Sequence, residues 1–247
     1  MNPSTPVGTG AQPQQLERPW WGLGDVAVGI IASQFFSILV FAVVAGAAGW
    51  ETTAEAPIWA IALLQMPLWI GLGGTAWWAS QHKGFGPVVD FSISSRLLDA
   101  PVGLGIGVAC QLVLLPVMYW PILRLFDLTT DDLAEPAREL SDRAGDTLGW
   151  VVLGLMVVFV APVVEELFYR GLVLRSLEKR RWPRWAVVVG SAALFAAMHF
   201  QVLQFPGLFV FGVVLALMTL ITGRLGPAIW AHAGFNGATV VLLYTSR

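Results

Sequence analysis

The sequence predicts an all-α, polytopic membrane protein: a transmembrane helical bundle of about seven spans, with eight as the alternative count. Two observations predict it. Of the 247 residues, 56% are hydrophobic and only 12% are charged, whereas about 25% of the residues in an ordinary soluble domain are charged. Apolar runs long enough to cross a bilayer recur along the chain, and the charged residues gather in the short connections between them.

The amino-terminal segment, residues 1–19, is rich in Pro, Gln, Gly, Ser and Thr, and such a composition buries too little apolar surface to fold. We therefore expect a disordered tail, followed by a single transmembrane helical domain over residues 20–247. The first apolar run is also much longer than the ~7 to 15 apolar residues of a signal peptide. We expect this run to stay as a membrane helix.

Seven apolar runs of roughly 20 residues or more are the candidates for spans. Two of them meet at Phe205 and Pro206 without a polar loop, so we expect a tight turn there. The runs are residues 21–49, 57–80, 99–126, 147–171, 185–204, 205–222 and 227–244.

The distribution of Lys and Arg predicts an orientation, because these residues favour the cytoplasmic side in short loops. We expect a cytoplasmic amino terminus and an external carboxyl terminus. The inner side then holds Arg18, Lys83, Arg96, Arg170, Arg175, Lys179, Arg180, Arg181, Arg184 and Arg224, and the outer side holds Arg124, Arg138, Arg143 and Arg247.

The charge balance excludes more than it predicts. The net charge of -2 gives no support to nucleic-acid binding. Cys110 is the only cysteine and lies in an apolar run, so no disulfide can form within the chain.

The acidic connection over residues 127–146 is expected to be a solvated, partly helical loop. In the apolar run before it, Gly103, Gly105 and Gly107 indicate close packing between helices.

Ionisable residues inside the apolar runs mark the candidate site, because each costs at least ~2.5 kcal/mol at the bilayer centre unless it is paired or hydrated. Glu166 and Arg170 are four residues apart on a helix, a spacing that suits an ion pair. Glu165 points about 100° away from that pair and has no local counter-charge. It is therefore a candidate acid or base, although both glutamates could instead anchor a helix end in interfacial water.

Two of the three histidines, His199 and His232, lie in the last apolar runs. His232 and Asn236 are four residues apart, so their N–H groups can converge on one point and stabilise an oxyanion. Phe195 and His199 share a helix face in the same way, and the phenyl ring can shape the pocket. Either histidine could alternatively make only a hydrogen bond between helices.

Three motifs, Glu165-Glu166-x-x-x-Arg170, Phe195-x-x-x-His199 and His232-x-x-x-Asn236, together resemble the motif set of the CAAX-processing and bacteriocin-processing (CPBP, or Abi) family of intramembrane glutamic endopeptidases. Their order and internal spacing match, and no position departs from the pattern. The resemblance covers residues 147–244, the expected catalytic region, and leaves the first three helices without a motif.

The resemblance implies roles for individual residues. Glu165 and His199 would activate a water molecule, and His232 and Asn236 would form the oxyanion hole. Glu166 and Arg170 would orient Glu165. It also implies a lipidated or transmembrane peptide substrate, which includes prenylated CAAX sequences, and a site in a bacterial plasma membrane.

The sequence leaves two alternative functions open for these residues. The histidines and a glutamate could bind zinc, although no His-Glu-x-x-His motif is present, and the main expectation is an enzyme without a cofactor. The same residues could form a proton relay or interhelical network in a transporter or bacteriocin-immunity protein. The sequence leaves the oligomeric state open.

Overall fold

The computed structural model describes residues 19–52 and 55–246, and every regular element in these ranges is helical. The predicted tail lies outside the described residues except for Pro19, whose carbonyl accepts a hydrogen bond from the Lys179 ammonium group (2.6 Å). The charge count also included Arg18 and Arg247, which lie outside the described residues as well.

The elements follow the predicted runs closely. In chain order they are α1 (Leu23–Ala48), α2 (Ile58–Lys83), α3 (Pro87–Asp90), α4 (Asp99–Ala109), the π-helical η2 (Cys110–Leu114), α5 (Leu115–Phe126), α6 (Thr130–Asp142), α7 (Thr147–Gly154), the π-helical η3 (Leu155–Val160), α8 (Ala161–Glu166), the π-helical η4 (Leu167–Val173), α9 (Leu174–Lys179), α10 (Arg184–Ala197), α11 (Phe205–Thr222) and α12 (Gly226–Thr245).

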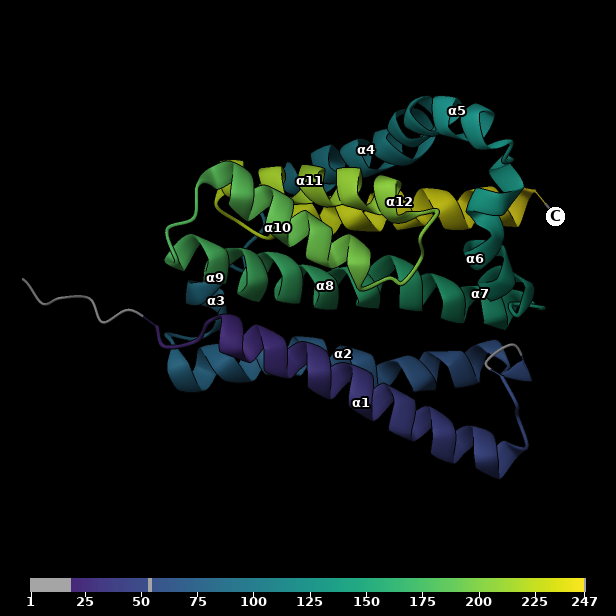
Figure 1. Ribbon diagram of the computed structural model, residues 1–247, viewed down its shortest axis with the longest axis horizontal. Coiled ribbons are helices and arrows are strands. Elements are labelled where there is room, and N and C mark those ends of the chain that lie inside the picture. The colour runs from purple at the N-terminus through teal and green to yellow at the C-terminus, as the bar shows by residue number, and fades with distance from the viewer. Residues whose placement is uncertain (1–18, 53–54, 247) are drawn as a thin grey trace, which may run out of the picture.

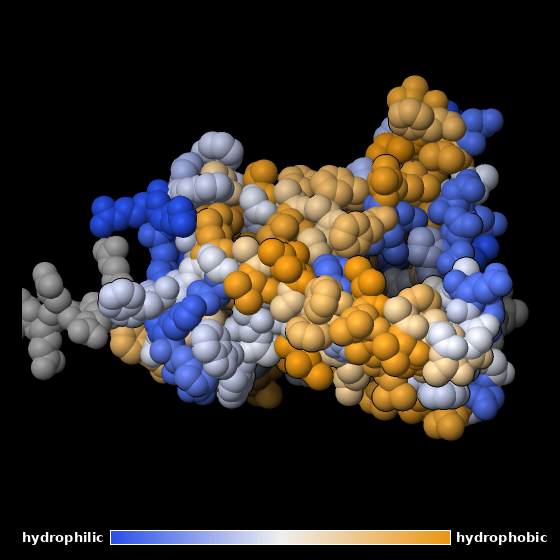
Figure 2. Space-filling model, turned by 60° about the horizontal axis from the view of Figure 1, so that its bottom comes forward, coloured by the Kyte–Doolittle hydropathy of each residue, from blue (hydrophilic) through white to orange (hydrophobic). Residues whose placement is uncertain are grey.

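The polytopic helical bundle is confirmed. Each of the seven apolar runs coincides with a helix, and five helical stretches within the described ranges are long and apolar enough to cross a membrane. The two others are α10, which has only 14 residues, and α12, which carries His232 and Asn236. Figure 2 shows the apolar side chains gathered across the middle of the molecule and hydrophilic ones towards its two ends, the pattern expected of a bilayer-spanning protein.

The helices form layers around one long helix (Figure 1). This long helix runs without a break from Thr147 to Lys179 through α7, η3, α8, η4 and α9. Helices α1 and α2 pack together on one side of it, whereas α10, α11 and α12 lie on the other, with α4 against α12. Its middle turns therefore lie between α2 and α12.

The acidic connection is partly helical, as predicted. A reciprocal pair of hydrogen bonds starts α6: the Asp132 N–H donates to the Thr129 hydroxyl (3.3 Å), and the Thr129 N–H donates to the Asp132 carboxylate (2.7 Å). This arrangement is a capping box, which satisfies two of the free N–H groups at a helix start. Because Thr129 and Asp132 are polar and exposed, they suit an aqueous connection between spans.

Hydrogen bonds join the connections at one end of the bundle. They link the starts of α1, α4 and α12 with the ends of α2 and α9, so successive long helices alternate in direction, as the charge count requires. The bonds are Trp20 N to Lys83 O (2.5 Å), Trp21 Nε1 to Asp90 (2.8 Å), Lys83 to Asp25 (2.6 Å), Arg224 to Asp99 (2.7 Å), Gly226 N to Ser94 O (3.1 Å) and Lys179 to Trp21 O. Which end faces the cytoplasm stays a prediction.

Glycines allow α4 to approach the backbone of α12. A Cβ atom on Gly107 would lie 1.9 Å from the Ala231 carbonyl oxygen, and one on Gly103 would lie 2.8 Å from the Pro227 oxygen. A Cβ atom on Gly105 would meet no heavy atom within 4 Å. Two of the three glycines in this run are therefore required by packing, and they lie four residues apart on one helix face.

We expect Gly107→Ala to destabilise the protein by about 1 to 3 kcal/mol, because the added methyl group pushes α4 away from α12. Gly105→Ala is the matched control and should be neutral or stabilising by up to about 1 kcal/mol, since alanine favours a helix. Thermal unfolding in detergent, followed by circular dichroism, measures both. Equal midpoints for the two variants would contradict the close packing of α4 and α12.

Candidate active site

Glu165 and Glu166 end a short α-helical segment that lies between two π-helical stretches. Segment α8 spans Ala161–Glu166, with η3 before it and η4 after it. A π-helical insertion changes the register of side chains around a helix, and such insertions are frequent at functional sites. The two glutamate side chains therefore point in directions that a regular α-helix through this region would not give them.

Glu166 accepts two hydrogen bonds on one carboxylate oxygen. Arg170 Nη1 and His232 Nδ1 both lie 2.9 Å from Glu166 Oε1. The Glu166 and Arg170 side chains are completely buried, and 4% of the His232 side chain is exposed. The pair expected from the spacing of Glu166 and Arg170 is therefore present, and His232 joins it from α12.

Arg170 also connects this pair to two other helices. Its Nη2 donates to the Gly212 carbonyl oxygen in α11 (3.1 Å), and its guanidinium lies 4.5 Å from the centre of the Phe195 ring in α10. The charge count placed Arg170 among the residues of the inner side, but the side chain lies in the protein core. A buried arginine needs such partners because an unpaired charge in a low-dielectric interior is very costly.

Glu165 faces both histidines. The distance from Glu165 Oε2 to Nε2 is 3.9 Å for His199 and also 3.9 Å for His232. Oε2 itself is buried and has no hydrogen-bond partner, although 17% of the whole side chain is exposed. At 3.9 Å these atoms are too far apart for direct hydrogen bonds, and this separation suits contact through a shared small molecule such as water.

The hydrogen bonds of the ring Nδ1 atoms assign the tautomers of the two histidines. His199 Nδ1 lies 2.8 Å from the Phe195 carbonyl oxygen, which can only accept, so this nitrogen carries the hydrogen. His232 Nδ1 faces the Glu166 carboxylate and carries a hydrogen for the same reason. In a neutral ring the Nε2 atom is then a lone-pair acceptor, and both Nε2 atoms point towards Glu165.

Phe195 holds the aromatic side of the site together. Its ring is fully buried and makes edge contacts with Tyr169, His199 and His232, at centroid distances of 5.3, 4.8 and 5.7 Å. The ring therefore separates the two imidazoles and limits their rotation. That Phe195 shapes the substrate pocket stays a prediction.

Asn236 satisfies a backbone carbonyl that its own helix cannot satisfy. Its Nδ2 donates to the Val157 oxygen in η3 (2.8 Å). In this π-helical stretch Ala161 N donates to Met156 O, so the donor for Val157 would be residue 162, which is a proline without an N–H. One amide hydrogen of Asn236 is thus used by Val157, and no hydrogen bond among the described residues uses the other.

A cavity of about 280 Å³ opens beside Glu165 and His199. Apolar side chains line most of it, including Leu72 and Trp69 from α2 and Met156 from η3. Three glutamines also line it: Gln34 from α1, Gln65 from α2 and Gln201 from the loop after α10. We did not single out these glutamines in the sequence, although polar residues inside apolar runs were a signal that could have found them.

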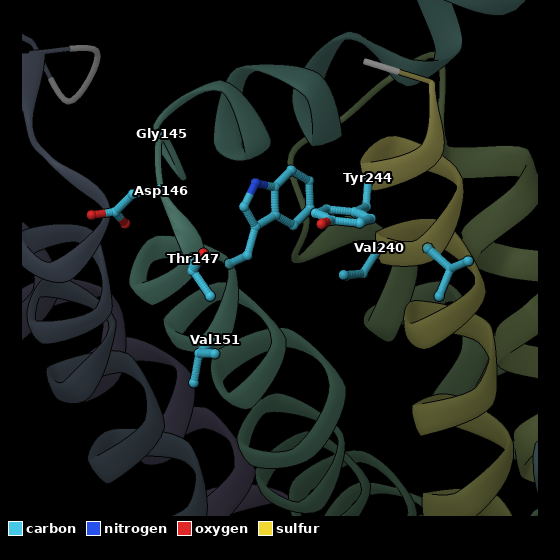
Figure 3. A pocket seen from close by; sticks show the side chains of 8 residues that line it. Gly145, Asp146, Thr147, Val151, Val240 and Tyr244 are labelled. Atoms are coloured by element: carbon cyan, nitrogen blue, oxygen red, sulfur yellow. The ribbon is translucent and has the colours of Figure 1, made fainter.

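A second hollow of about 750 Å³ lies between the start of α7 and the end of α12, with Trp150 and Tyr244 among its lining residues (Figure 3). Figure 3 shows that its side chains come from both helices. None of the seven site residues predicted from the sequence lines it. Glu165 and His199 line the smaller cavity, so we place the candidate site there, and the other five predicted residues line neither hollow.

The lengths of the helices explain how Glu165 and His199 reach similar depths in the bundle. Counted along the predicted run, which ended at residue 171, Glu165 lies much nearer the inner end of its helix than His199 does. The helix in fact continues to Lys179, so Glu165 lies about 21 Å from that end, and His199 lies about 22 Å beyond the start of α10 at Arg184. His232 lies only about 9 Å beyond the start of α12 at Gly226, but its Nε2 also lies 3.9 Å from Glu165 Oε2.

Within the described parts of the chain, no group of three or more His, Cys, Asp or Glu side chains has an arrangement that could hold a metal ion. The atoms nearest to such a set are the Glu165 carboxylate and the Nε2 atoms of His199 and His232.

Residues 147–238 match the model of a protein family described as "Type II CAAX prenyl endopeptidase Rce1-like". The match covers all three motifs and confirms the resemblance to the CPBP family. This is a family of proteases, which supports an intramembrane endopeptidase, and the apolar helices support an integral membrane protein. Comparisons with curated proteins and with solved structures gave no match.

We expect Arg170→Met to lower the free energy of unfolding by about 3 to 5 kcal/mol, because it leaves the Glu166 carboxylate buried without its counter-charge. The double variant Glu166→Leu/Arg170→Met removes both charges and should lose less stability than Arg170→Met alone. Denaturant titrations in detergent measure both variants. A double variant that loses as much stability as Arg170→Met, or more, would contradict the prediction that the unpaired Glu166 carboxylate causes the loss.

Proposed function

We propose, from the family match of residues 147–238, that this chain is an intramembrane endopeptidase in which Glu165 and His199 activate a water molecule. One observation carries the proposal. Glu165 Oε2 has no hydrogen-bond partner and lies 3.9 Å from Nε2 of His199 and from Nε2 of His232, at the wall of a cavity. A carboxylate without a partner inside a membrane-spanning helix is by default a candidate functional group.

In the proposed reaction, a water molecule lies between Glu165 and His199. Glu165 removes one of its protons, and His199 Nε2 accepts a hydrogen bond from the other, so that the oxygen attacks the carbonyl carbon of the scissile peptide bond. The new C–O bond makes a tetrahedral oxyanion. Glu165 then gives its proton to the amide nitrogen, the C–N bond breaks, and a carboxylic acid and an amine leave.

His232 and Asn236 are proposed to stabilise the oxyanion. Asn236 has one N–H left after its bond to Val157, and His232 can donate from Nε2 when its ring carries both hydrogens. Each donor of this kind contributes about 3 to 4 kcal/mol to the transition state.

The proposed substrate is a membrane-associated peptide, either transmembrane or lipidated, and prenylated CAAX-type sequences are the first class to test. The depth of Glu165 within its helix and the apolar lining of the cavity support a substrate that enters from the bilayer. The proposed location is the plasma membrane of a bacterial cell, with a cytoplasmic amino terminus.

Zinc-dependent proteolysis is the competing mechanism, because a carboxylate and two imidazole nitrogens are common zinc ligands. A non-enzymatic role as a transporter or immunity protein is the second competitor. Activity that survives exhaustive chelation, with no metal in elemental analysis, would exclude zinc. Proton-coupled uptake into liposomes without peptide cleavage would favour a transporter.

We expect Glu165→Gln and His199→Ala each to lower kcat by about 10² to 10⁴-fold, the contribution of a positioned general base. The assay uses purified protein in detergent and quenched fluorescent peptides, both prenylated CAAX peptides and transmembrane segments. Matched controls are Glu139→Gln on the exposed face of α6 and His82→Ala at the end of α2, which should keep the parental rate. Folded Glu165→Gln protein that cleaves at the parental rate would refute the proposal.

A further inference from the structure

The three glutamines that line the catalytic cavity, Gln34, Gln65 and Gln201, come from three separate parts of the chain. Gln34 lies within α1 and Gln65 within α2, and both helices are candidate membrane spans. All three side chains are partly buried. A leucine or methionine would fill the same wall without bringing a polar group into the bilayer, so the choice of glutamine calls for an explanation.

No hydrogen bond joins these three carboxamides to any residue in the described ranges. The other glutamine of the loop after α10 behaves differently, since Gln204 donates to the Leu133 carbonyl oxygen in α6 (3.1 Å). A polar group without a partner at membrane depth is destabilising. Gln111 Oε1 also has no partner but lies away from the cavity, so the lack of a partner alone does not indicate a ligand; Gln34, Gln65 and Gln201 combine it with a place in the cavity wall, where their carboxamides can bind a ligand.

Close helix contacts fix where Gln34 and Gln65 lie. A Cβ atom on Gly71 of α2 would lie 2.5 Å from Ser33 Cα, next to Gln34, so α1 and α2 are in backbone contact there. A Cβ atom on Gly73 would lie 3.3 Å from Val164, beside Glu165, so α2 also packs against α8. These contacts hold Gln34 and Gln65 in a fixed position relative to the helix that carries Glu165.

One face of α2 supplies much of this wall. Gln65, Leu68, Trp69 and Leu72 all line the cavity, and their spacing of three, four and seven residues places them on one side of a helix. Gln65 is the polar residue on an otherwise apolar face. A ligand along this face would meet apolar side chains with one carboxamide between them.

The chemistry of the lining indicates the kind of group that binds. A carboxamide offers both a C=O acceptor and N–H donors, which match the N–H and C=O of a peptide group. None of the residues that line the cavity is Lys or Arg, so the lining has no cation for a lipid phosphate or a carboxylate. A neutral, amide-rich ligand fits better than an anionic one.

We propose that Gln34, Gln65 and Gln201 bind the main-chain amides of an extended substrate peptide and so position its scissile bond against Glu165. This inference rests on the proposed peptidase function. It makes these glutamines substrate-binding residues supplied largely by helices α1 and α2, which carry none of the three motifs. In this proposal the three glutamines bind the peptide backbone, and the apolar side chains of the cavity contact the side chains of the substrate.

The test uses Gln65→Met and Gln34→Met, because methionine keeps the length of the side chain and removes its hydrogen bonds. Each variant should raise KM by about threefold to tenfold, the effect of one lost hydrogen bond, and leave kcat nearly unchanged. Gln111→Met is the matched control, because Gln111 is also inside a candidate span but does not line the cavity. It should keep the parental KM.

A second measurement identifies the bonding partner. Peptides in which one non-scissile amide at a time is replaced by an ester lose a single N–H. At one position the effects of the ester and of a glutamine variant should be less than additive, since both remove the same hydrogen bond.

Additive effects at every position, a lowered kcat with unchanged KM, or an equal effect of Gln111→Met would each overturn this inference while Glu165-dependent cleavage persists. Cleavage that does not depend on Glu165, or no cleavage of any peptide, would instead overturn the proposed function and this inference with it.

Discussion

The Glu166 carboxylate is the point at which three helices of the catalytic region are joined. Its Oε1 accepts from Arg170 on its own helix and from His232 on α12, and Arg170 also donates to the Gly212 carbonyl on α11. These groups are almost completely buried, so each charge must be compensated within the protein. The position and tautomer of His232, and therefore the direction of its Nε2 atom, depend on this one carboxylate.

Two adjacent glutamates consequently have opposite environments. Glu166 is bonded on one side of the helix, whereas Glu165, about 100° further round, has an oxygen without a partner between two imidazoles. The same need to satisfy buried groups explains Asn236, which replaces the N–H that Pro162 cannot give to Val157. The bonded oxygen of Glu166 holds the geometry of the site, whereas Glu165, with its unpartnered Oε2, lines the cavity.

The sequence predicted the interactions that depend on helix periodicity, such as the Glu166–Arg170 pair, and it predicted the helical bundle. The family resemblance implied that Glu165 and His199 share a water molecule. Helix periodicity alone could not show that both histidines approach Glu165, because this depends on a helix that continues to Lys179 and on the place where the short α10 ends. The sequence also left Gln34 and Gln65 unnoticed. Their importance comes from the packing of α1 and α2 against the catalytic helix, which no local motif encodes.

The central claim is that Glu165 acts on water and does not attack the substrate itself. A single-turnover reaction in ¹⁸O-labelled water, followed by mass spectrometry of both the product and the protein, tests it most directly. A general base places the label in the new carboxylate of the first product and leaves Glu165 unlabelled. Label incorporated into Glu165, with an unlabelled first product, would show a covalent acyl-enzyme and contradict the account.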